Sequence, residues 1–278
     1  MPADFRFNSY KWRDRPNSLK SRWLSMSILI KIILVNIAVF VLLRILAIVA
    51  ALSGNGEIIK AGFNAVQLPA SFVALATHPW TILTYMFVQY DLLHLIFNML
   101  WLYWFGTIFL TVNPSRRLLP VYLYGGLAGA LVFLFVGPIT GSDGLIGASA
   151  SVIAIVTATA MMVPNYSVQL FLIGNVRLKW VAIITVAIDI LSLGGIETGS
   201  HISHLGGAIA GVVYVILRKH SKLLTKSTPA SEKISGAPVD TIDAILDKIK
   251  RSGYTSLTPQ ERARLFEASR ENQDNKNR

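Results

Sequence analysis

A serine, a histidine and two hydrogen-bond donors stand out in a chain that is otherwise poor in polar chemistry. Ser149 follows Gly147 at the start of an apolar segment, where the free N–H groups of a helix N-terminus could stabilise an oxyanion. His204 begins another apolar segment, and histidine is the usual base that activates a serine. His94 and Asn98 share one face of a helix and could both donate to a developing negative charge. Together these residue types are the parts that acyl transfer requires.

Each of these features also has a purely structural interpretation. Ser149 could be a helix N-cap, and His204 could be a hydrogen-bonded histidine at a helix interface. His94 and Asn98 could form a polar contact between helices. They are a poor pair of metal ligands, and no carboxylate completes a site, so we expect no metal and no organic cofactor. His201 lies nearer a loop and is expected to be a bystander.

Small residues predict how the serine and histidine segments meet. They recur at four-residue spacing after the serine and again after the histidine, which gives each segment a face that another helix can approach closely. If these two faces pack together, the serine and the histidine lie side by side at one end of a helix bundle. The small residues expected at this contact are Gly147, Ala150, Ala154, Ala158, Gly207 and Gly211.

The composition indicates a membrane domain. Of the 278 residues, 53% are hydrophobic and only 15% are charged, whereas soluble domains carry about 25% charged residues. The absence of cysteine excludes disulfides, thiolate catalysis and zinc–thiolate sites. A membrane-spanning helix needs about 20 apolar residues, and the fourth and fifth candidates are short. The six predicted spans are 27–48, 92–111, 117–136, 149–163, 178–194 and 202–218.

The charges predict the orientation of the bundle. The net charge is +11, and the basic residues lie in the loops of one side of the bundle, which the positive-inside rule assigns to the cytoplasm. Because this pattern accounts for the basic residues, a nucleic-acid partner has no support. The opposite loops contain acidic residues, with Lys60 as their one basic residue. Both termini are therefore predicted to be cytoplasmic, with the reactive residues near the outer face. The basic residues in question are Arg6, Lys11, Arg13, Arg15, Lys20, Arg22, Arg116, Arg117, Arg177, Lys179, Arg218 and Lys219, and the acidic ones are Glu57, Asp91, Asp143 and Glu197.

Two charged residues fall inside predicted spans. Arg44 lies late in the first span and is expected to reach the outer interface with its long side chain. Asp189 lies in the outer half of the fifth span, where a carboxylate is a candidate for function. A direct role for Asp189 and a contact with interfacial water both stay open.

The chain changes character after the last span. Residues 227–238 read as a linker, and the spacing of apolar residues from Ile242 to Ile249 predicts an amphipathic helix. Thr258, Pro259 and Glu261 form the signature of a second helix start, a capping box. We expect a small helical hairpin that docks on the membrane domain, on a second copy or on another protein. The predicted organisation is a cytoplasmic segment 1–26, a membrane domain 27–220, a linker 221–239 and a helical domain 240–278.

At these motifs the chain resembles the rhomboid family of intramembrane serine proteases, over roughly residues 78–218. The resemblance implies an all-α, polytopic fold of six transmembrane helices and a Ser–His dyad without a catalytic acid. It implies Ser149 as nucleophile and His204 as general base, with His94, Asn98 and the Ser149 amide as oxyanion hole. The motifs are Pro79-Trp80-Thr81, Thr84-Tyr85-Met86-Phe87, His94-xxx-Asn98-Met99-Leu100-Trp101, Phe105-Gly106, Gly147-x-Ser149 and His204-xx-Gly207-xxx-Gly211.

The chain departs from the family pattern at two positions near these motifs. Ala150 stands where the family motif Gly-x-Ser-Gly ends in glycine, and because alanine is small we expect activity to survive. Ser203 stands where alanine often precedes the histidine. The Trp-Arg pair found in the first outer loop of some members is missing from 49–77. The tail at 240–270 resembles a helical extension of some bacterial rhomboid-like proteins.

The resemblance implies hydrolysis of peptide bonds in or beside the transmembrane segments of other membrane proteins. The expected partners are these substrates, the lipid bilayer and a protein that binds the C-terminal hairpin, and the expected location is a bacterial inner (plasma) membrane. One alternative is a catalytically inactive rhomboid-like protein that binds and escorts membrane clients. Another is a small transporter, which would place ionisable residues along a central pathway, whereas Asp189 is the one acidic residue well inside a predicted span.

Overall fold

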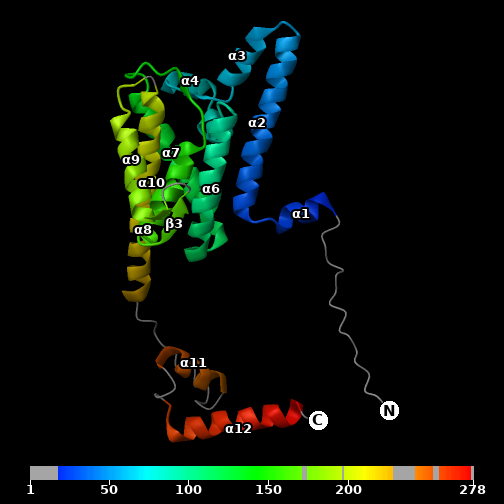
Figure 1. Cartoon of the computed structure of the whole chain (residues 1–278), viewed down its shortest axis with the longest axis vertical. Helices are drawn as coiled ribbons and strands as arrows, with labels where there is room; N and C mark the ends of the chain where they lie inside the picture. The colour runs from blue at the N-terminus through cyan, green and yellow to red at the C-terminus, as the bar shows by residue number, and fades with distance from the viewer. Residues whose placement is uncertain (1–17, 171–173, 196, 228–241, 253–256, 277–278) are drawn as a thin grey trace. The chain divides into compact units, whose positions relative to one another are not determined.

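A computed structural model describes residues 18–170, 174–195, 197–227, 242–252 and 257–276. The chain divides into two compact units, Met1–Lys222 and Leu223–Arg278. The larger unit is a bundle of long helices joined by short helices and by two small two-stranded sheets in its described residues (Figure 1). Its long helices are α2 (Ile28–Leu52), α6 (Leu92–Val112), α7 (Leu118–Val136), α8 (Ser149–Met162), α9 (Leu178–Leu191) and α10 (Thr198–Ser227). Its short helices are α1 (Leu19–Ser25), α3 (Gly56–Asn64), α4 (Phe72–Thr77), α5 (Thr81–Thr84), η1 (Tyr85–Phe87) and η2 (Ser115–Arg117).

Each of the six predicted spans corresponds to one of the long helices, so the fold is an all-α, polytopic membrane fold as predicted. Within the part of the chain that the structure describes, four helical stretches are long and apolar enough to cross a membrane, and they lie on α2, α6, α7 and α10. The helices α8 and α9 have 14 residues each, which corresponds to about 21 Å of helix. That is shorter than the hydrocarbon core of about 30 Å. Six crossings therefore stay a prediction.

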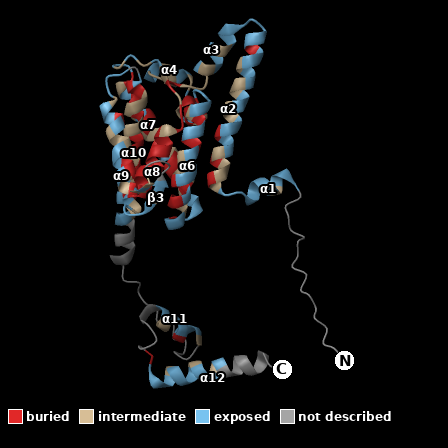
Figure 2. Ribbon diagram, in the orientation of Figure 1, coloured by how far each residue is buried: buried red, intermediate tan, exposed pale blue. Residues whose placement is uncertain are grey.

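Helix α8 lies at the centre of the bundle, where its side chains are buried on every side. All of its residues from Ala150 to Ala160 are buried. Buried residues gather on α8 and on the sides of α6, α7 and α10 that face it, whereas α2 is largely exposed (Figure 2). Exposed apolar side chains on α2 suit a helix that faces lipid.

Glycines on α7 allow the central helix to approach. A Cβ atom added to Gly129 would lie 2.7 Å from the Cβ of Ala150, and one on Gly126 would lie 2.7 Å from the Oγ of Ser151. At Gly125 an added Cβ would collide with Ala154. At these positions α7 has no side chain of its own, so its backbone packs directly against the small side chains of α8.

Among the described residues, two small antiparallel sheets of two strands each connect parts of the bundle. Strand β1 (Leu68–Pro69) pairs with β2 (Gly144–Leu145) and ties the segment after α3 to the residues that precede α8. Strands β3 (Ser167–Leu170) and β4 (Gly174–Arg177) connect α8 to α9. Neither pairing of strands was predicted from the sequence.

The larger compact unit ends at Lys222, close to the predicted boundary at residue 220, and the predicted domain bounds stay a prediction. Helix α10 continues to Ser227, past the predicted boundary at residue 220, because its helical hydrogen bonding carries on into the predicted linker. Residues 228–241 lie outside the described residues, as do residues 1–17 of the predicted cytoplasmic segment.

The smaller unit contains two helices, α11 (Ile242–Ser252) and α12 (Pro259–Lys276), which contact each other. The predicted capping box is present. The Thr258 N–H donates to Glu261 Oε2 at 2.7 Å, and the Glu261 N–H donates to Thr258 Oγ1 at 3.3 Å. Ile245 of α11 is buried, whereas Phe266 of α12 is 72% exposed.

Candidate active site

The candidate residues come from four helices whose ends meet. Ser149 is the first residue of α8, and His204 lies two turns into α10. His94 lies in the first turn of α6, with Asn98 on the next turn, and Asp189 lies near the end of α9. Side chains of all five residues line one cavity.

Ser149 and His204 are hydrogen-bonded. The Oγ of Ser149 lies 2.7 Å from the Nε2 of His204. The residue that caps α8 is Ala148, and no side chain of the described residues caps this helix end. The Ser149 hydroxyl therefore contacts the histidine and does not act as an N-cap.

The small residues on α8 and α10 bring the two side chains together. A Cβ atom added to Gly207 would collide with the carbonyl oxygen of Ala150. One added to Gly211 would lie 2.5 Å from the Ala154 carbonyl oxygen and 3.1 Å from the Ala158 backbone nitrogen. The two helices thus pack backbone to backbone along the predicted faces.

Gly147 has a different position from the other small residues. It lies in the turn before α8 with a φ of 130°, a conformation that favours glycine. Its N–H donates to the Tyr85 carbonyl at 3.0 Å, and an added Cβ would lie 2.9 Å from the Cε1 of His94. Gly147 therefore packs against an imidazole ring and not between two helices.

The hydrogen bonds of His94 leave a donor beside the serine. Its Nδ1 accepts a hydrogen bond from the Tyr90 N–H at 3.2 Å. The proton of the neutral ring is then on Nε2. An added Cβ on Gly147 would lie 3.3 Å from this nitrogen and 3.4 Å from the Ser149 Oγ, so the donor and the hydroxyl flank the same small space.

The amide of Asn98 is held by a buried chain of hydrogen bonds that the sequence analysis missed. Its Nδ2 donates to Gln89 Oε1 at 2.9 Å, and Gln89 Nε2 donates to Asn36 Oδ1 at 3.0 Å. Asn36, on α2, donates to the Tyr122 hydroxyl at 3.3 Å, and that hydroxyl donates to the Met86 carbonyl at 2.8 Å. An amide nitrogen has two hydrogens, so Asn98 keeps one N–H for a ligand.

Asp189 does not reach interfacial water, because it is only 4% exposed. Its Oδ1 lies 2.8 Å from the Nδ1 of His204 and 2.8 Å from the Nδ1 of His201. His201 therefore contacts a residue of the site, although its position near a loop suggested that it would lie apart from it. By distance alone the three residues could also hold a metal ion, because their ligand atoms lie within 4.8 Å of one another.

Arg44 was expected to extend to the outer interface, and in the structure its guanidinium donates to the Tyr90 carbonyl. It also lies over the Phe40 ring, 5.2 Å from the ring centroid. Tyr90 in turn bonds His94 through its N–H. Helix α2 therefore contacts the residues that precede α6 through the Arg44 guanidinium as well as through the Asn36 amide.

The cavity at these residues has a volume of about 280 Å³. Its polar side chains lie beside an apolar wall contributed by α6, α8 and α9, so a chain segment that enters it would meet both kinds of surface. The apolar lining residues are Phe97, Trp101, Val152, Ile153 and Ile188.

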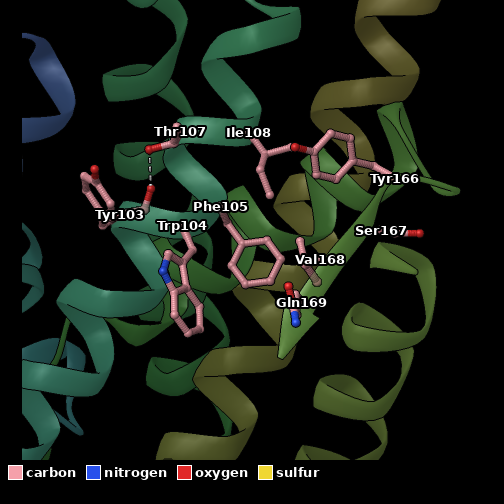
Figure 3. Close-up of a pocket in the computed structure, with 9 residues that line it drawn as sticks. All are labelled: Tyr103, Trp104, Phe105, Thr107, Ile108, Tyr166, Ser167, Val168 and Gln169. Carbon is pink, nitrogen blue, oxygen red and sulfur yellow. Dashed lines mark hydrogen bonds between the residues drawn. The ribbon is translucent and has the colours of Figure 1, made fainter. Parts of the chain in front are cut away.

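A second cavity, of about 320 Å³, lies between α6 and β3 (Figure 3). Aromatic side chains, including Tyr103, Trp104 and Tyr166, line it. The Thr107 hydroxyl, also at this cavity, donates to the Tyr103 carbonyl at 2.6 Å. Its lining contains hydroxyl groups but neither an imidazole nor a carboxylate, so it offers no base to activate a nucleophile.

Comparison with known proteins supports the resemblance. The Rhomboid domain family matches residues 76–221, which is more than half of the chain. A family of unknown function (DUF6576) matches residues 240–271.

Two relatives are similar to the chain over this region. Presenilin-associated rhomboid-like protein A, mitochondrial, of Danio rerio is 28% identical over 141 residues, which cover 46% of this chain and 35% of the relative. RHOMBOID-like protein 12, mitochondrial, of Arabidopsis thaliana is 31% identical over 159 residues, which cover 50% of this chain and 46% of the relative. The matches thus span less than half the length of either relative.

Proposed function

Because the chain belongs to the rhomboid family, we propose that it is an intramembrane serine protease that hydrolyses peptide bonds in or beside transmembrane segments. The observation that carries this proposal is the 2.7 Å contact between Ser149 Oγ and His204 Nε2. A serine paired with a base, beside donors that face the same cavity, is the arrangement of an activated nucleophile.

The proposed reaction begins with attack of Ser149 Oγ on the scissile carbonyl carbon, while His204 Nε2 takes the hydroxyl proton. The carbonyl oxygen becomes an oxyanion, which the Ser149 N–H, the His94 Nε2–H and the Asn98 Nδ2–H stabilise. His204 then gives its proton to the leaving nitrogen as the C–N bond breaks. Water attacks the acyl-enzyme by the same route, with His204 again as base, and releases Ser149.

The apolar and polar lining of the cavity favours one class of substrate, a transmembrane segment with a locally extended backbone. Its apolar wall suits the side chains of a transmembrane segment, but the reaction needs an extended backbone at the serine. Opening a helix in lipid exposes backbone groups at a cost of several kcal/mol each. We therefore expect substrates whose helices are weak near the cut, with glycine, proline or small residues.

We also propose that both termini lie in the cytoplasm and that the cavity opens near the outer face, because Lys and Arg gather in the loops of one side. Because the chain has no cysteine, single cysteines can report this directly. An impermeant maleimide added to intact cells should label Asp143→Cys and should label Lys219→Cys only after lysis. The reverse labelling pattern would show that the loops lie on the opposite sides of the membrane. The bacterial inner membrane stays a prediction, since both relatives are named as mitochondrial.

The test of protease chemistry is labelling of the detergent-solubilised chain by a fluorophosphonate, which reacts with activated serines. Wild type should be labelled, whereas Ser149→Ala and His204→Ala should not. Thermal unfolding of all three proteins shows whether the variants stay folded. A folded wild type that resists the probe and leaves a helix-destabilised transmembrane substrate intact would point to the alternative, an escort protein for membrane clients.

A further inference from the structure

We propose that Asp189 completes a Ser149–His204–Asp189 triad, as a positioning residue that orients the His204 ring and stabilises its charged form during the reaction. This inference rests on the proposed function and departs from the Ser–His dyad that the resemblance implies. Asp189 touches no substrate atom in this arrangement, and it acts through His204.

The hydrogen bonds of His204 determine which nitrogen carries its proton. A carboxylate can only accept, so the 2.8 Å contact with Asp189 Oδ1 places the proton on His204 Nδ1. The lone pair of Nε2 then faces Ser149 Oγ at 2.7 Å, ready to accept the hydroxyl proton. The opposite tautomer would direct an N–H at the serine and could not act as a base.

The burial of Asp189 gives its charge a large effect on His204. The residue is 4% exposed, and the contact joins its oxygen directly to the imidazole that becomes positive when it takes the proton. Charges interact more strongly away from water. A buried carboxylate therefore stabilises the imidazolium, and with it the transition state of serine attack.

His201 holds the carboxylate in place from the same helix. His201 and His204 lie three residues apart on α10, so their rings project from one face, and their planes are at 86°. Both Nδ1 atoms meet the same oxygen of Asp189, while Oδ2 has no hydrogen-bond partner among the residues that the structure describes. Two donors on one oxygen fix the carboxylate of α9 against α10.

Because Oδ2 has no partner among the described residues, Asp189→Asn can test the charge of Asp189 separately from its contacts. The asparagine carbonyl can accept both imidazole N–H groups, and its NH₂ group takes the place of Oδ2. This variant therefore keeps the contacts of Asp189 and removes its charge. A residue that merely connects α9 to α10 would tolerate the change, whereas a member of the triad would not.

The experiment measures kcat and KM for cleavage of a transmembrane substrate and the rate of fluorophosphonate labelling, in detergent, with thermal unfolding as control. For Asp189→Asn we expect a fall in kcat of about 10²–10⁴-fold, slower labelling, and a nearly unchanged KM and unfolding midpoint. Asp189→Glu should recover part of the loss because it restores the charge. His201→Gln, which keeps the Asp189 carboxylate, should stay within about tenfold of wild type.

Spectra of the full chain with ¹⁵N-labelled histidine separate this inference from the proposed function. In wild type and in Ser149→Ala, both His201 and His204 should carry their proton on Nδ1. If wild type resists the probe but shows these tautomers, the protease proposal fails while the positioning by Asp189 holds.

Three results would overturn the triad. The first is an Asp189→Asn variant that labels and cleaves like wild type. The second is a His204 protonated on Nε2 in the resting wild type. The third is wild-type activity that disappears with a chelator and returns with zinc, because the cluster would then be a metal site.

Discussion

Gly207 on α10 lies so close to Ala150 on α8 that a single added methyl group would meet the alanine carbonyl oxygen. His204 precedes Gly207 by one turn, and Ser149 precedes Ala150 by one residue. The separation of the two backbones therefore sets the distance between the serine hydroxyl and the imidazole.

Gly207→Ala should separate these helices. Overpacking of a tight contact costs about 1–3 kcal/mol, and a shift of a few tenths of an ångström lengthens the Ser149–His204 hydrogen bond. We expect a lower unfolding temperature and a labelling rate at least about tenfold slower. Gly62→Ala on α3 is the matched control, because an added Cβ there meets nothing within 4 Å. Equal labelling rates of the two variants would show that the contact does not control the site.

Asn98→Ala should slow the chemical step. The side chain is expected to donate to the oxyanion, which exists only after attack, so its loss should lower kcat by about 10²–10³-fold and leave KM nearly unchanged. Steady-state cleavage of a transmembrane substrate measures both constants. A higher KM at an unchanged kcat would instead assign Asn98 to substrate binding.

Gln89→Leu should disturb the same step from a distance. Gln89 is 2% exposed and connects Asn98 to Asn36, so its loss leaves buried amide groups without partners at a cost of about 1–3 kcal/mol. We expect lower thermal stability together with a lower kcat. Gln67→Leu provides the comparison, because its side chain makes a hydrogen bond at an exposed position, to Asn64 at 2.8 Å. A stable Gln89→Leu variant with full activity would rule out a role of this chain of hydrogen bonds.

The ion pair of the small unit predicts an acid-sensitive hairpin. Lys248 donates to both oxygens of Glu261 at 2.8 Å, and together with the Thr258 N–H it lowers the pKa of Glu261. The stabilisation is complete above the ordinary glutamate pKa of about 4.3 and is lost as the pH falls through the lowered value. The protection factors of α11 and α12 in the full chain, which correct hydrogen exchange for the slower chemical step in acid, should therefore fall as the pH is lowered. Glu261→Gln should exchange faster at neutral pH and respond less to acid. An identical acid response in both proteins would argue against the ion pair.

The sequence predicts the parts of the site that depend on local spacing. Ser149 at a helix start and the small residues after it follow from periodicity alone, and the same holds for Gly207 and Gly211 on the partner face. The capping box at Thr258 is a similar local signal, and the structure contains it.

Contacts that leave no repeated pattern in the sequence were not predicted. Asn36 and Gln89 are single amides in apolar surroundings, and nothing in their neighbours indicates that they meet. Asp189 and His201 come from separate helices joined by a loop, so their contact depends on how α9 packs. The three-residue spacing of His201 and His204 was a usable signal, because helix geometry places such residues on one face.

The amide of Asn36 has a consequence for how the protein can be divided. The Rhomboid domain match begins at residue 76, yet Asn36 bonds both Gln89 and Tyr122 from a helix that ends at Leu52. A truncation at the start of the match would remove the partner of the Gln89 amide and open one side of α6. A shortened chain that keeps the hydrogen bond of the Gln89 amide therefore includes α2, and a chimera that exchanges α2 must supply an amide at the same depth.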